Sequence, residues 1–168
     1  MSIAQSLLPE FDHEMATTRK VLERVPDAKA EWKPHAKSFS MGNLAQHIAE
    51  LVGWTTMTMS TTELDMAPPG GEAYKTPAFT SMADLLARFD KNVADARAAL
   101  AAASDADFMV GWTLKMAGES LFTIPRVGCV RTWVMNHVIH HRAQLSVYLR
   151  LNDIPVPSMY GPSADEQG

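Results

Sequence analysis

The chain contains little of what marks several common classes of protein. Its 168 residues include one cysteine, Cys129, so no internal disulfide can form and a reducing compartment is expected. Lysine and arginine are scattered, and the net charge of −4 offers no positive patch for nucleic acid. No apolar run approaches the roughly 20 residues of a membrane span, and the N-terminus carries no basic leader. We therefore expect a cytoplasmic protein whose partners are neither nucleic acids nor membranes.

The chain does have enough apolar material for one domain. Hydrophobic residues make up 46% of the sequence and charged residues 20%, at a length typical of a single domain. No internal repeat or low-complexity tract stands out, which argues against a solenoid or a disordered module. We expect residues 1–168 to form one domain, with a polar, mobile tail over 158–168.

Apolar residues recur at steps of three and four in four segments, which is the spacing of a buried helix face. Pro26, Pro68 and Pro155 mark breaks around these segments, and the Ser40 hydroxyl is placed to cap the second one. Between residues 104 and 125 the pattern weakens to an alternation that fits either a short hairpin or an extended loop. The sequence therefore predicts an all-α fold, a four-helix bundle, with helices over about residues 3–25, 41–63, 80–103 and 126–152.

Three histidines fall on helix faces that are predicted to be buried. His137 and His141 are four residues apart, so their imidazoles project from the same side of the last helix. His47 lies on the apolar stripe of the second helix, whereas His140 is rotated by about 100° from His141 and is peripheral. Three imidazoles with an open position are typical of a reactive site for zinc, nickel or a similar ion. The alternative is that these histidines only form hydrogen bonds, because their spacing also arises by chance.

Motifs around these histidines resemble the DinB-like family of metalloenzymes. The likeness extends over residues 7–152 and is carried by the segments 32–38, 42–51, 136–145 and 148–150. It implies an up-down-down-up order of helices and one divalent metal ion held by His47, His137 and His141. Some members of the family use a small thiol such as bacillithiol or mycothiol as a co-substrate. Homodimers are common among them, so the resemblance also implies a homodimer.

The leading functional hypothesis is a metal-dependent enzyme acting on a small-molecule substrate, either thiol S-transferase-like or hydrolase-like, in which the metal activates a thiol or a water. Glu50 is a candidate to orient an imidazole or accept a proton, and Gln144 is a candidate substrate contact. A solvated or ion-paired Glu50 is the alternative. A non-catalytic metal-binding stress-response or interaction protein, and a degenerate site that takes up metal only after purification, also stay open. The residues identify neither the substrate nor the native metal, and none of them indicates contact with DNA.

Further residues have two interpretations at this point. Cys129 is offset by about 80° from His137 on a regular α-helix, so we expect a buried structural residue rather than the attacking thiol. Arg142 and Arg150 either meet an anionic substrate or only pair with surface carboxylates. The four tryptophans either line a pocket or belong to the core; they are Trp32, Trp54, Trp112 and Trp133.

Overall fold

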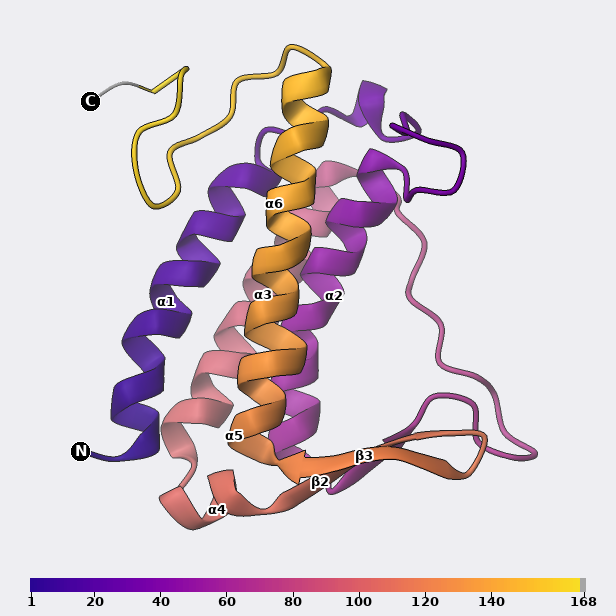
Figure 1. Cartoon of the computed structure of the whole chain (residues 1–168), viewed down its shortest axis with the longest axis vertical. Helices are drawn as coiled ribbons and strands as arrows, with labels where there is room; N and C mark the ends of the chain where they lie inside the picture. Colours follow the sequence, from indigo (N-terminus) through magenta and orange to yellow (C-terminus); the bar gives the residue numbers. More distant parts are fainter. Residues whose placement is uncertain (167–168) are drawn as a thin grey trace.

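Four long helical segments form most of the computed structural model, which describes residues 1–166 (Figure 1). In the view of Figure 1, α1 and α6 run upward, while α2 and α3 run downward. The last segment consists of α5, a π-helical turn (η2) and α6, which follow one another without a break. The bounds of the helices are α1 Ile3–Leu22, η1 Asp27–Lys29, α2 Met41–Ser60, α3 Met82–Ala102, α4 Asp105–Met109, α5 Arg126–Cys129, η2 Val130–Met135 and α6 Asn136–Leu151.

The prediction of an all-α fold is wrong, because a three-stranded sheet lies beside one end of the helices (Figure 1). Strands β2 (Gly111–Met116) and β3 (Glu119–Pro125) pair antiparallel, so the hairpin is the correct one of the two structures considered for this region. Ala117 and Gly118 form its turn, both with positive φ, as tight hairpin turns require. Strand β1 (Glu63–Asp65) adds to β2 in parallel. Its three residues are too few to show a periodicity, which is why the sequence did not reveal it.

Serine side chains begin the helices at the places that capping predicts. The Ser40 hydroxyl accepts a hydrogen bond from the Asn43 amide at the start of α2, and Ser81 caps α3 by accepting one from the Asp84 amide. Two helices end about three residues earlier than predicted. At the end of α2 the guanidinium of Arg126 donates to the Thr61 carbonyl at 2.7 Å, which satisfies a backbone acceptor of the helix terminus.

The core is divided between the helices and the sheet. Phe11, Leu44, Phe89 and Leu145 are among the fully buried residues that join α1, α2, α3 and α6. A second, smaller cluster lies against the sheet and contains Trp112, Leu114 and Cys129, with Trp54, Phe122 and Ile124 packed on it. The sheet is thus attached to the helices through a core of its own. Within residues 1–166, no helix is long and apolar enough to cross a membrane.

One face of α6 carries a buried ion pair that also reaches the C-terminal segment. The Arg142 guanidinium lies 2.7 Å from the Glu14 carboxylate of α1, and the two side chains are 1% and 7% exposed. Arg142 also donates to the Thr18 hydroxyl, and the Tyr160 hydroxyl contacts both Arg142 and Glu14. Arg142 thus pairs with a carboxylate, but the pair is buried and not at the surface as expected.

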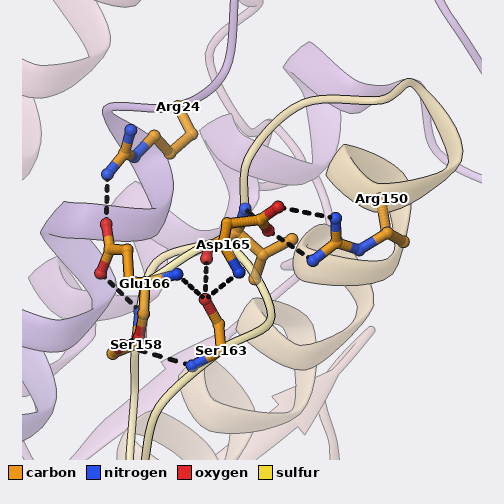
Figure 2. Close-up of polar contacts among 7 residues, drawn as sticks. Arg24, Arg150, Ser158, Ser163, Asp165 and Glu166 are labelled. Atoms are coloured by element: carbon orange, nitrogen blue, oxygen red, sulfur yellow. Dashed lines mark hydrogen bonds and ion pairs between the residues drawn. The ribbon is translucent and has the colours of Figure 1, made fainter. Parts of the chain in front are cut away.

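The C-terminal segment contacts the helices through further ion pairs, which Figure 2 shows. Arg150 of α6 pairs with Asp165, and Arg24 pairs with Glu166 at 2.6 Å. Arg150 therefore also pairs with a carboxylate. The mobility predicted for residues 158–168 stays a prediction, and residues 167–168 lie outside the described part of the chain.

Candidate metal centre

The three histidines predicted to bind metal come together from two helices. His47 projects from α2, and His137 and His141 project from successive turns of α6. One ligand nitrogen from each ring lies within 4.8 Å of those of the other two. The ring centroids of His47 and His141 are 4.8 Å apart, and those of His47 and His137 are 5.2 Å apart. The hydrophobic periodicity of the two helices had placed these three side chains on facing surfaces, and the structure brings them together.

Partial burial keeps these imidazoles in the form that binds metal ions. Loss of hydration, reinforced by the neighbouring rings of His141 and His137, lowers the pKa of His47 to about 4. Burial likewise lowers the pKa of His137 and of His141. A lowered histidine pKa favours the neutral ring, whose unprotonated nitrogen can donate to a metal. The donor set is therefore suited to a divalent ion of the zinc or nickel kind.

Gln144 holds one of the three rings in a defined orientation. Its side-chain oxygen lies 2.7 Å from Nδ1 of His141, and its side-chain nitrogen lies 3.1 Å from Nε2 of the exposed His140. An amide oxygen can only accept, so this contact favours the tautomer of His141 that is protonated on Nδ1, in which Nε2 is free to bind a metal. The structure places Gln144 next to a candidate ligand, and its predicted contact with a substrate stays a prediction. His140 is peripheral, as its position on the helix suggested.

The π-helical turn Val130–Met135 lies immediately before the two histidines of α6. Such turns are rare and often occur at functional sites. Trp133 lies in this turn, its backbone forms a hydrogen bond with His137, and its ring stands edge-on to that imidazole at 6.4 Å. The π-helical turn was not predicted. Its hydrogen bonds span one residue more than those of an α-helix, and over six residues this difference does not change the spacing of apolar residues detectably.

Cys129 lies away from the site, as predicted. Its side chain is fully buried in the small core against the sheet, with Sγ 3.6 Å from the Thr58 hydroxyl. Burial raises the pKa of this thiol, which disfavours the nucleophilic thiolate. The chain's own cysteine is therefore not a source of the attacking sulfur.

A cavity of about 230 Å³ opens beside His47 and His137. Trp54 and Trp133 line it, whereas Trp112 belongs to the core and Trp32 packs against Tyr148, so the tryptophans divide between the two roles considered. The remaining lining residues are Glu50 and Leu51 from α2 and Met66, Tyr74 and Thr76 from the long connection to α3. The connection has no periodic pattern, so its part in the site was not predicted.

Glu50 lines this cavity and is also ion-paired. Its Oε1 lies 3.0 Å from a guanidinium nitrogen of Arg88 and 3.1 Å from the side-chain nitrogen of Gln46. Within residues 1–166 it forms no hydrogen bond with an imidazole. The ion-paired alternative considered for Glu50 is therefore the one observed, and its predicted catalytic role stays a prediction.

Phe39 is a further residue of the site that sequence reasoning missed. Its ring is 52% exposed and lies 5.8 Å from the ring of His47 and 6.5 Å from that of His141. Phe39 directly precedes Ser40, the N-cap of α2. A single apolar residue in a loop belongs to no periodic pattern, so the sequence did not indicate its position. Phe39 lies beside the histidine group and is not among the residues that line the cavity.

The sequence and the fold are those of a known group of proteins. The sequence pattern of the DinB superfamily matches residues 10–145, so the chain belongs to this family. The uncharacterized protein YrdA of Bacillus subtilis (strain 168) is 24% identical over 159 residues, which cover 95% of this chain and 89% of YrdA.

Two solved structures share the fold. A DinB-like protein from Bacillus cereus ATCC 10987 superposes with a TM-score of 0.73 at 21% identity, covering 95% of this chain and 98% of that one. The DinB-like protein YjoA from Bacillus subtilis superposes with a TM-score of 0.66 at 16% identity, covering 96% and 99%. At these identities the likeness establishes the fold, and the chemistry has to be argued from the site itself.

Proposed function

We propose that His47, His137 and His141 bind one divalent metal ion, zinc or nickel, and that the protein is a metal-dependent enzyme. The observation that carries this proposal is the convergence of three neutral imidazoles from two helices beside an open cavity. Three protein ligands that leave a coordination position vacant are the arrangement of catalytic rather than structural zinc sites. When bound, such an ion lowers the pKa of a thiol or a water and supplies a nucleophile near neutral pH.

The residues around the triad have separate tasks in this proposal. Gln144 fixes the orientation of His141, and the Phe39 ring packs beside His47 and His141. The cavity holds the substrate next to His47 and His137, and the Glu50 carboxylate accepts a proton there. Because Cys129 is buried elsewhere, a transferred sulfur comes from a small-molecule thiol. We propose thiol S-transfer or a related hydrolysis as the reaction, performed by a homodimer.

The cavity favours catalysis over a purely metal-binding role. A stress-response or interaction protein would need the ion but no vacant volume beside it, whereas an enzyme needs room for a substrate. The cavity of about 230 Å³ has two of the proposed ligands in its wall.

The test is metal content and thiol transfer measured on the same preparations. Untagged wild type and His137→Ala are analysed by plasma mass spectrometry, then assayed with bacillithiol and mycothiol as donors and a fluorogenic haloalkyl electrophile. His13→Ala, which changes an exposed histidine of α1, is the control. We expect about one ion per chain in wild type and control, almost none in His137→Ala, and turnover only where metal is present. Failure of wild type to take up zinc or nickel would overturn the metal site, and metal without turnover would favour the non-catalytic role.

A further inference from the structure

Three aromatic side chains, which are all at least partly exposed, line the cavity beside the histidines. Trp133 is 39% exposed and Tyr74 is 36% exposed, whereas Trp112 is fully buried. Large aromatic rings that remain partly in water around a hollow are typical of binding surfaces. Trp54, the third ring, lies on α2.

Contacts with neighbouring residues hold these rings in place. The Trp54 indole nitrogen donates to the Tyr74 hydroxyl at 3.4 Å, and the two rings meet edge to face with centroids 5.8 Å apart. Trp133 stacks on Phe122 of β3 with centroids 4.8 Å apart and planes within 20°. The rings are therefore ordered before a ligand arrives, which reduces the entropy lost on binding.

Glu50 adds one charged acceptor to this apolar lining. The side chains of Gln46 and Arg88 both donate hydrogen bonds to Oε1 of Glu50. Within residues 1–166, no donor is within hydrogen-bond distance of Oε2. The Glu50 side chain is 16% exposed and belongs to the cavity wall. A ligand that places an O–H or N–H group here would form a charge-assisted hydrogen bond.

From these features we infer that the cavity is the binding site for a small planar ring compound that carries a hydrogen-bond donor, such as a phenol or an indole. The volume of about 230 Å³ is below the roughly 300 Å³ at which pockets for drug-sized ligands begin, so the compound has one or two rings. Aromatic side chains favour planar rings through stacked and edge-to-face contacts. The site binds the ring without a metal, but its role as a substrate site rests on the proposed function.

The class of ligand can be tested with matched probes in a shift titration of the isotope-labelled protein by NMR. Phenol is compared with anisole, and indole with 1-methylindole, because methylation removes the donor and keeps the ring. Cyclohexanol replaces the planar ring by a saturated one. We expect indole and phenol to bind about tenfold more tightly than their methylated forms and cyclohexanol to bind most weakly. Equal affinity for cyclohexanol and phenol, or no binding of indole by wild type, would overturn the inference.

Variants place the binding within the cavity. Trp133→Ala and Tyr74→Ala should each weaken indole binding by about tenfold, whereas Trp133→Phe keeps a ring and should stay within about threefold of wild type. Both positions are partly exposed, so the core is left intact. Glu50→Gln keeps the shape and should remove most of the preference for indole over 1-methylindole. Leu151→Ala, at an exposed position in the last turn of α6, is the control. Wild-type affinity in both alanine variants would contradict the assignment.

The same titration separates this inference from the proposed function. It is performed on chelator-treated protein and again after addition of zinc. Probe binding without zinc uptake would leave the ring site standing and overturn the metal centre. Zinc uptake without probe binding would support the metal centre and overturn the ring site.

Discussion

Two adjacent residues of α6, His141 and Arg142, belong to buried polar clusters of opposite character. Arg142 faces Glu14 and Thr18 of α1 and Tyr160 of the C-terminal segment, which satisfy its charge and its donors. His141 lies beside His47 of α2 and His137 of its own helix, and these imidazoles offer no opposite charge. A cluster whose polar atoms satisfy one another is complete without a ligand. The three converging imidazoles near His141 do not satisfy one another in this way. This difference distinguishes the structural face of α6, at Arg142, from the candidate functional face, at His141.

The largest expected effect comes from breaking the complete cluster. Replacing Arg142 by alanine leaves the Glu14 carboxylate buried without its counterion, which costs about 3–5 kcal/mol of folding free energy. Urea unfolding followed by circular dichroism would measure this loss. His141→Ala in the metal-free protein should cost clearly less, since the cluster that it leaves has no unpaired charge. Similar losses in both variants would refute the comparison.

Metal binding should stabilise the folded protein only through the group of three histidines. If the folded protein alone binds zinc, free zinc at a hundred times its Kd adds about 2.7 kcal/mol to the free energy of unfolding. We expect this gain in wild type and in the His13→Ala control, and its absence in His47→Ala. Thermal unfolding with and without zinc would show it. An equal zinc effect in His47→Ala would mean that the ion binds elsewhere.

A smaller effect is expected from the residue behind the triad. Gln144→Ala removes the acceptor for Nδ1 of His141, and losing such an outer partner typically lowers metal affinity by 10–100-fold. Competition with a chromophoric zinc chelator would measure the change. Gln144→Glu, which retains a side-chain oxygen acceptor, should restore affinity. If Gln144→Ala binds zinc as wild type does, the orientation of His141 is set by packing alone.

The smallest effect is expected at the edge of the complete cluster. Tyr160→Phe removes the hydroxyl that bridges Arg142 and Glu14 and keeps the ring. Because the ion pair itself remains, the loss of unfolding free energy should be about 1 kcal/mol. Zinc affinity should not change, and a chelator competition on the same variant would detect any coupling between the two faces of α6.

The parts of the molecule with a regular period could be predicted from the sequence. Spacings of three and four residues located the long helices, and the same spacing set His137 and His141 on one side of α6. Glu14 carried no such signal, since a charged residue on an apolar stripe looks like a solvated one until Arg142 is placed beside it. Whether a polar residue is satisfied depends on contacts distant in the chain, which no local pattern encodes.

The Glu14–Tyr160 hydrogen bond joins residues 146 positions apart, close to the full length of the chain. The entropy cost of closing so long a loop grows only slowly with length, but its two ends meet late, after the shorter-range contacts have formed. During synthesis, Glu14 lacks its partners until α6 and the segment after it have left the ribosome. His137 and His141 lie on that same helix, so the donor set is completed at the same stage. On the proposed function, metal capture would therefore require α6, and a nascent chain that ends before α6 would lack two of the three proposed ligands.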